Sequence, residues 1–405
     1  MTTSVETTAP VRPGTPAWRA LLARIAEGAE QREQDEQGPY EVIGWLKEAG
    51  FTRLRLPVEE GGAGLSLREL FAAVIDLAEA DANAAHVVRA HLWFVEQQLD
   101  SPDPEAQARG FELLRSGAVV GNGFSEQGRK DVGLHFDTAF TPDPSGSGFR
   151  LNGEKFYSTG TLYADYTQIW AAAPNGRIAG VVVPVDREGV TVVDDWDGFG
   201  QRLTGTGTTR LDDVRVEDHE IFDLGLPVDS EQPPSHHGAF LQLYLQALTA
   251  GVLRSVRNDA VGLVRRRART FSHAASAPHE DRQVLQVVGQ IDADAFAAEA
   301  IVLAAADAVQ AAADSVSGGI PDETLAAKAQ LAAAQAKVAI DRFSYATAAA
   351  LFDVGGASAT QRRYNLDRHW RNVRTISTHN PAHLKAAAVG DHRVNGAAFP
   401  ANAYF

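Results

Sequence analysis

The 405-residue chain contains no cysteine, and it contains a single methionine. The missing thiols exclude disulfides, thiolate catalysis and cysteine-ligated zinc or iron–sulfur centres. No basic segment followed by an apolar run stands at the amino terminus, so no secretory signal is expected. No apolar run approaches the roughly 20 residues that span a bilayer. We therefore expect a cytoplasmic, soluble protein that has no membrane partner.

Several catalytic motifs are also missing. The sequence has no G-x-S-x-G nucleophile elbow and no H-E-x-x-H zinc motif, and "GTGTTR" lies among strands rather than between a strand and a helix. Pro381 separates His379 from His383, and His236 and His237 lie in a proline-rich loop. We therefore predict no bound metal. The formal charge of −15 repels phosphate backbones and excludes nucleic acid as a partner.

The pattern of apolar residues changes at both ends of the central third of the sequence. Residues 1–16 are rich in threonine and proline and predict a disordered leader. Amphipathic helices are predicted over 17–117, short β-branched runs with turn signals over 118–225, and helices again over 226–405. The sequence thus predicts an α+β fold, in which an N-terminal α-domain precedes a central antiparallel β-barrel or sandwich and a C-terminal four-helix bundle.

Two alanine-rich segments predict the packing seams of that bundle, because apolar residues recur in steps of three and four. The first seam comprises Val284, Val288, Ile291, Ala295, Ala298, Val302, Ala305, Val309 and Ala312. The second comprises Ala329, Ala332, Ala336, Ala339, Phe343, Ala346 and Ala350. A further helix is predicted from about residue 240 to 270.

Short sequence motifs reduce the number of folds that fit this order of domains. The stretches "GNGFSEQG", "LNGEKFYSTG" and "DDWDGFGQRLTGTGTTRLDDVRV" resemble the acyl-CoA dehydrogenase fold. The carboxy-terminal "RHWRNVRTISTHNPAHLK" is similar to one branch of it, the reduced-flavin-dependent monooxygenases of the dibenzothiophene monooxygenase type. The resemblance covers nearly the whole chain after the leader.

The resemblance implies a two-component enzyme. It would use FMNH2, with FAD as an alternative, and molecular oxygen to form a C4a-hydroperoxyflavin that oxygenates a small organic substrate at sulfur, nitrogen or an activated carbon. A separate NAD(P)H-dependent flavin reductase would supply the reduced flavin, and the assembly would be a homotetramer. Val95 stands where the dibenzothiophene enzyme has tyrosine, which leaves the substrate open.

The resemblance also implies the site residues. Three would be catalytic, namely His91, Ser158 and His379. The flavin would be held by Asn122, Ser125, Tyr157, Ser158, Thr159, Trp196 and Arg269. The segment 125–135 would form a lid that excludes water. For each position an ordinary structural role is the alternative: a strand end for Ser158, a satisfied core histidine for His91, and a helix terminus for Arg269.

Two other functions fit the same scaffold. An FAD-dependent acyl-CoA dehydrogenase needs a glutamate base, in the family either after a Gly-Gly segment near the carboxy terminus or on a bundle helix. Neither "DVGGASATQRRYNLDRHWRNVRTISTH" nor "LYLQALTAGVLRS" contains glutamate. A catalytically silent flavoprotein is the other alternative. The missing base favours the monooxygenase.

Overall fold

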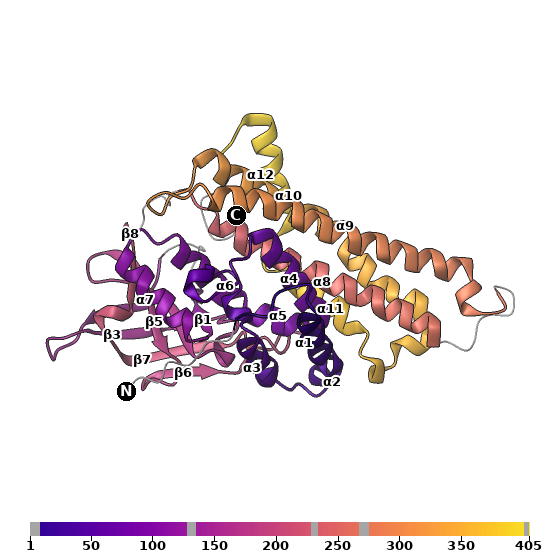
Figure 1. The fold of residues 1–405 in the computed structure, drawn as a ribbon, viewed down its shortest axis with the longest axis horizontal. Helices are drawn as coiled ribbons and strands as arrows, with labels where there is room; N and C mark the ends of the chain where they lie inside the picture. Colours follow the sequence, from indigo (N-terminus) through magenta and orange to yellow (C-terminus); the bar gives the residue numbers. More distant parts are fainter. Residues whose placement is uncertain (1–8, 128–134, 228–233, 267–274, 401–404) are drawn as a thin grey trace.

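The computed structural model describes residues 9–127, 135–227, 234–266, 275–400 and 405. Helices form both ends of the chain, and a sheet forms the middle (Figure 1). The predicted order of α-domain, β-domain and α-domain is confirmed. Of the predicted leader, residues 9–15 pack on the N-terminal domain, where the Val11 amide donates to the Ala49 carbonyl at 2.8 Å. This contact ties part of the segment predicted as a leader to the helix that ends near Ala49.

The N-terminal helices lie between the sheet and the long helices of the C-terminal part (Figure 1). They are α1 (Pro16–Glu27), α2 (Ala29–Gln34), α3 (Tyr40–Glu48), α4 (Leu67–Ala80), α5 (Ala82–Val87), α6 (Arg89–Leu99) and α7 (Pro104–Arg115). Helix α4 begins with a capping box of Ser66 and Glu69, and its apolar face packs on the C-terminal helices. Asp81 caps α5 by accepting from the amides of Asn83 and Ala84.

The central domain is one eight-stranded sheet in the order β6-β7-β3-β2-β4-β5-β8, with β1 paired to β4. Its strands are β1 (Val120–Gly123), β2 (Ala139–Pro142), β3 (Phe149–Lys155), β4 (Tyr166–Ala172), β5 (Arg177–Pro184), β6 (Val190–Val193), β7 (Thr208–Val216) and β8 (Ile221–Pro227). Most neighbours are antiparallel, as predicted, but β1–β4 and β2–β4 are parallel. The sheet is therefore mixed.

In the described part of the chain, five α-helices follow the sheet: α8 (His237–Arg266), α9 (Arg282–Ala313), α10 (Glu323–Gly355), α11 (Asp367–Ser377) and α12 (Ala382–Asn395). Helices α8, α9 and α10 pack along one another, and α4 joins them from the N-terminal domain. The seam of α9 is confirmed from Ile291 onward. In α10 the buried side chains leave the predicted seam after Ala336 and continue through Ile340, so Ala346 is exposed.

Helix α9 is the helix, within the described ranges, whose length and apolar composition would suffice to cross a bilayer. One face of it packs on α8 and α10. The opposite face leaves Phe296 74% and Leu285 47% exposed.

Candidate active site

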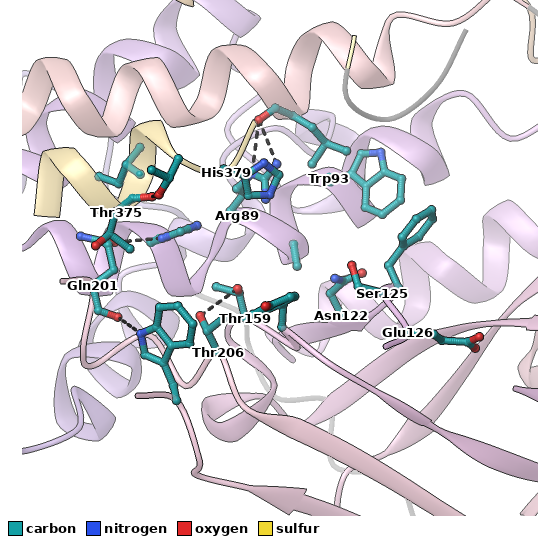
Figure 2. Close-up of a pocket in the computed structure, with 18 of the residues that line it drawn as sticks. Arg89, Trp93, Asn122, Ser125, Glu126, Thr159, Gln201, Thr206, Thr375 and His379 are labelled. Carbon is teal, nitrogen blue, oxygen red and sulfur yellow. Dashed lines mark hydrogen bonds between the residues drawn. The ribbon is translucent and has the colours of Figure 1, made fainter. Parts of the chain in front are cut away.

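A cavity of about 560 Å³ lies where the three parts of the chain meet. This volume falls within the range of about 300–1,000 Å³ that small-molecule sites occupy. Its described wall comes from α5 and α6, from the ends of β1 and β3, from the loop before β7, and from the start of α8 and the end of α11 (Figure 2). The cavity is thus formed jointly by the N-terminal helices, the sheet domain and the C-terminal helices.

The segment after β3 forms one wall of this cavity. Tyr157, with a φ of 55°, and Thr159 line the cavity, whereas Ser158 does not belong to its described lining. Ser158 is fully buried, and its Oγ has no hydrogen-bond partner among the described residues. The hydroxyl that lines the described cavity is that of Thr159, and the predicted role of Ser158 stays a prediction.

Gly160 allows this segment to approach the N-terminal domain. It has a φ of 85°, and a Cβ at this position would lie 2.3 Å from the carbonyl oxygen of Val87 at the end of α5. A side chain would meet both a strained backbone and a fixed carbonyl. The glycine of "FYSTG" therefore permits the contact between sheet and helix that places Thr159.

A chain of hydrogen bonds runs along the same wall. The hydroxyl oxygens of Thr159 and Thr206 lie 2.9 Å apart (Figure 2), and those of Thr206 and Thr204 lie 2.6 Å apart. Thr204 Oγ1 and Trp196 Nε1 both donate to the Gln201 carbonyl, at 2.8 and 3.0 Å. The Gln201 side chain in turn meets His86, with Oε1 2.8 Å from Nδ1. These contacts hold Gln201 in its left-handed backbone conformation, with a φ of 52°.

Three buried polar atoms on the cavity wall have no protein partner within the described ranges. They are Oδ1 of Asn122, Nε2 of Gln201 and Nε1 of Trp93, one acceptor and two donors. Buried polar atoms are nearly always hydrogen-bonded, so an unpaired donor and acceptor in one cavity indicate a polar ligand. Ser125, also predicted, lines the cavity as well.

Aromatic side chains enclose the cavity. Tyr157 and Trp196 meet edge to face with centroids 6.2 Å apart, and both line it. Trp93, from α6, stacks on Trp170 of β4 at 5.7 Å and lines the opposite part. Flat, rigid apolar surfaces of this kind suit a planar ring system and keep water away from it.

Three histidines are among the described lining residues, namely His86, His135 and His379, and the pKa is lowered in His86 and His379. Burial, with the positive charge of Arg89, lowers the pKa of His86 to about 3. His379 is exposed to solvent, yet partial desolvation by the neighbouring protein and the positive charges near Arg89 and His86 lower its pKa well below the ordinary value. A neutral imidazole donates a hydrogen bond through one ring nitrogen and accepts one through the other. The catalytic role that the resemblance implies for His379 stays a prediction.

His91 is not among the described residues of the cavity wall. It is fully buried on the other face of α6, where Nε2 lies 2.8 Å from the Thr52 carbonyl and Nδ1 accepts from the Val120 amide at 3.2 Å. Burial lowers its pKa to about 4. These contacts join α6 to β1 and favour the structural alternative for His91, while its predicted catalytic role stays a prediction. Arg269 and residues 128–134 of the predicted lid lie outside the described residues.

Comparison with known proteins places this architecture in a family. The N-terminal domain model of the acyl-CoA dehydrogenases matches residues 17–109, and their C-terminal domain model matches residues 243–383. The chain belongs to the acyl-CoA dehydrogenase fold family. The two matches flank the sheet and together cover more than half of the sequence.

Individual relatives within the acyl-CoA dehydrogenase fold family cover almost the entire chain. A probable FMNH2-dependent monooxygenase of Pseudomonas putida is 27% identical, over 95% of this chain and 96% of the relative. A dibenzothiophene monooxygenase of Rhodococcus erythropolis is 28% identical, over 94% and 91%. The FMN-bound structure of TdsC from Paenibacillus superposes with a TM-score of 0.86 at 28% identity, over 96% of this chain and 98% of that one.

For a member of the acyl-CoA dehydrogenase family, the carboxylates of the cavity decide which chemistry is open. Glu126 is the acid among its described lining residues, and the sequence analysis did not predict it. Its carboxylate accepts from Lys155 Nζ at 2.7 Å and from the amides of Asp137 and Thr138 at 2.7 and 3.0 Å. Burial alone would raise the pKa of Glu126, but these hydrogen bonds, led by that of Lys155, lower it to about 2.

A general base needs a pKa near the working pH and room to receive a proton. Glu126 has neither, because Lys155 and two amides occupy its oxygens. The structure therefore agrees with the sequence in offering no dehydrogenase base among the described residues of the cavity.

Other lining residues were missed as well. His86 lines the cavity from the end of α5, and Arg89 and Trp93 line it from α6, four residues apart on one face; Arg89 also donates to the Leu241 carbonyl at 3.1 Å. That spacing was the available signal. Both faces of this segment are buried, however, and apolar periodicity alone does not say which one meets a ligand.

Proposed function

We propose that this chain is a reduced-flavin-dependent monooxygenase, which uses FMNH2 and O2 to add one oxygen atom to a small organic substrate at sulfur, nitrogen or an activated carbon. The observation that carries the proposal is the ion pair of Glu126. The cavity is built for a planar polar ligand, yet the carboxylate of Glu126 on its wall is held by Lys155 at 2.7 Å. The flavin monooxygenases among the relatives support the choice.

The cavity residues fit FMN. The unpaired Oδ1 of Asn122 and Nε2 of Gln201 supply an acceptor and a donor for the polar edge of the ring, and the hydroxyls of Thr159 and Thr206 supply further ones. Trp93 and Trp196 offer apolar surface for the ring. When bound, reduced FMN would supply the electrons that activate oxygen.

The chain's own residues would orient and protect that chemistry. His379, neutral at pH 7, would donate a hydrogen bond to a polar oxygen in the cavity. The aromatic walls would exclude water, which limits the wasteful loss of reducing equivalents to hydrogen peroxide. The ion pair of Glu126 with Lys155 keeps a fixed, compensated charge at the wall.

The finer features of the prediction belong to the same proposal. The enzyme would depend on a separate NAD(P)H-dependent flavin reductase and would work in the cytoplasm. It would be a homotetramer, and the exposed Phe296 and Leu285 on α9 supply apolar surface for contact between copies. FMN is preferred over FAD because the similar structure of TdsC is FMN-bound.

The test is reconstitution of the purified protein with FMN, NADH, oxygen and a flavin reductase, followed by a substrate screen read by mass spectrometry. The expected result is a product that gains one oxygen atom, with the label from ¹⁸O₂ and not from labelled water. A matched assay supplies acyl-CoA thioesters and an electron-accepting dye without oxygen. Dye reduction in the second assay, with no oxygenated product in the first, would overturn the proposal in favour of a dehydrogenase.

A further inference from the structure

A cluster of possible metal ligands lies where α6 ends and α8 begins. Asp100 is the residue that caps the carboxyl end of α6, and His236 and His237 stand at the first turn of α8. Asp100 Oδ2 lies 3.4 Å from His236 Nε2 and 3.2 Å from His237 Nε2. One ligand atom from each residue lies within 4.8 Å of the other two. None of the three belongs to the described wall of the flavin cavity.

The spacing matches the edges of a metal coordination sphere. Zinc bonds to nitrogen and oxygen are about 2.0–2.1 Å long, so neighbouring ligands around a tetrahedral ion lie about 3.3 Å apart. The two measured edges, 3.2 and 3.4 Å, bracket that value. The imidazole rings stack with centroids 4.6 Å apart and 29° between their planes, so both present Nε2 to the same carboxylate oxygen.

Hydrogen bonding accounts for His237, whose Nε2 lies 3.2 Å from Asp100 Oδ2, but it does not account for His236. His236 is 1% exposed, and neither of its ring nitrogens has a hydrogen-bond partner among the described residues. A buried imidazole normally pairs both nitrogens, and an unpaired nitrogen aimed at a carboxylate at non-bonding geometry calls for a third group between them. A divalent ion supplies that group.

The surrounding charge favours a cation. A side cavity of about 380 Å³ adjoins Asp100 and is lined also by Arg55 and Asp314. Arg55 is paired with Glu96, Nε to Oε1 at 2.7 Å, which leaves the carboxylates of Asp100 and Asp314 in excess. The start of α8 contributes positive dipole charge, which opposes a cation, while the end of α6 contributes negative dipole charge, which attracts one. The two helix dipoles oppose each other, so the excess negative charge of the carboxylates makes the site favourable for a cation.

We propose that Asp100, His236 and His237 bind one divalent transition-metal ion of the zinc class, with a fourth position open to water from the side cavity. Two imidazoles and one carboxylate form a ligand set that zinc accepts and that also binds cobalt and nickel. The ion would clamp α6 to α8. These helices also meet at the catalytic cavity, where Arg89 of α6 donates to the Leu241 carbonyl of α8.

The experiment uses the full chain without a histidine tag, stripped by chelator and dialysed against zinc chloride. Metal analysis counts bound zinc, and thermal unfolding is followed at each zinc concentration. The variants are Asp100→Asn and His237→Ala, both at partly exposed residues, with His279→Ala as a matched control at an exposed histidine outside the cluster. Circular dichroism establishes that each variant is folded.

The expected result is one zinc per chain in the wild type and in His279→Ala, with a melting temperature that rises as zinc is added. In Asp100→Asn and His237→Ala the affinity should fall by at least about tenfold, because even loss of an outer-shell partner costs this much. Equal zinc binding by all four proteins, or no stoichiometric zinc in the wild type, overturns the proposal. The test needs no flavin, so its failure leaves the monooxygenase proposal standing.

Discussion

Replacing Lys155 by methionine tests the idea that the cavity carboxylate is neutralised by its partner. Lys155 is fully buried, its Nζ lies 2.7 Å from Glu126 Oε1, and the Glu126 side chain is 6% exposed. Methionine keeps the packing of the lysine stem beside Phe136, whose ring centroid lies 4.2 Å from Nζ. Removing one partner of a buried ion pair costs about 3–5 kcal/mol. The cavity gives Glu126 some access to water, so we expect a cost of about 3 kcal/mol at neutral pH.

The pH dependence of that cost is the sharper test. In the wild type the pKa of Glu126 falls from an unfolded value of 4.5 to about 2, so its contribution is complete above pH 4.5 and is lost as pH falls toward 2. In Lys155→Met, burial without the cation should raise the same pKa above 4.5, so the variant should gain stability as pH falls. The two proteins should therefore converge by about 1 kcal/mol or more between pH 8 and pH 4.

The assay is urea unfolding followed by circular dichroism at pH 8 and pH 4, on either side of the sequence pI of 5.2, where solubility is lowest. Lys328→Met, at an exposed position of α10, is the control and should change neither midpoint. A cost that is the same at both pH values, or that stays below about 1 kcal/mol, would refute the role given to the Lys155–Glu126 pair.

Three further predictions concern the cavity. Thr159→Val should weaken FMN binding about tenfold, as expected for loss of roughly one hydrogen bond, while Ser158→Ala should leave it unchanged, as measured by quenching of flavin fluorescence; the reverse order would support the predicted role of Ser158. His379→Leu should lower kcat about 100-fold, whereas His379→Gln, which retains a donor, should lower it less. Wild-type kcat should not change from pH 6 to 8, because the pKa of His379 lies well below its ordinary value. A change of kcat with a midpoint near pH 6.5 would contradict a neutral donor. Gly160→Ala should lower the urea midpoint by the equivalent of about 1–3 kcal/mol, because its Cβ would lie 2.3 Å from the Val87 carbonyl oxygen, and an unchanged midpoint would show that this approach is not tight.

The spacing of apolar residues predicted the long helices, because this spacing depends only on which side of a helix is buried. The alternation of three and four in α9 follows directly from a helix with one buried face, and its core from Ile291 onward was correct. In α10 several alanines flank the true seam, and because alanine is tolerated on either side of it, the sequence does not fix the register beyond Ala336. The parallel pairing of β1 with β4 was missed for a different reason: it joins segments separated by a hairpin, and no local signal encodes it.

The site was predicted less well than the fold, because its residues differ from their sequence neighbours only in which side chain faces the cavity. Ser158 and Thr159 are adjacent hydroxyls, and the turn in the backbone at Tyr157 decides which one reaches the cavity. His86 lies on α5 and His91 on the next helix, α6, and the packing of α6 against β1 turns His91 away from the cavity. Glu126 looked like a loop residue because its partner Lys155 stands 29 positions away in sequence.

The carboxy-terminal "RHWRN" motif shows how distant segments fix the cavity. Asn372 of α11 accepts from the Gln201 amide at 2.7 Å and donates to Glu33 of α2 at 3.1 Å. Arg371, beside it, donates to the same Glu33 carboxylate at 3.0 Å and to the Phe199 carbonyl at 3.0 Å. The loop that carries Gln201 is therefore held by one carboxylate from the first domain and by two side chains from the last. Because Gln201 orients His86 and offers an unpaired donor, the ligand-binding wall forms only when all three parts of the chain have assembled.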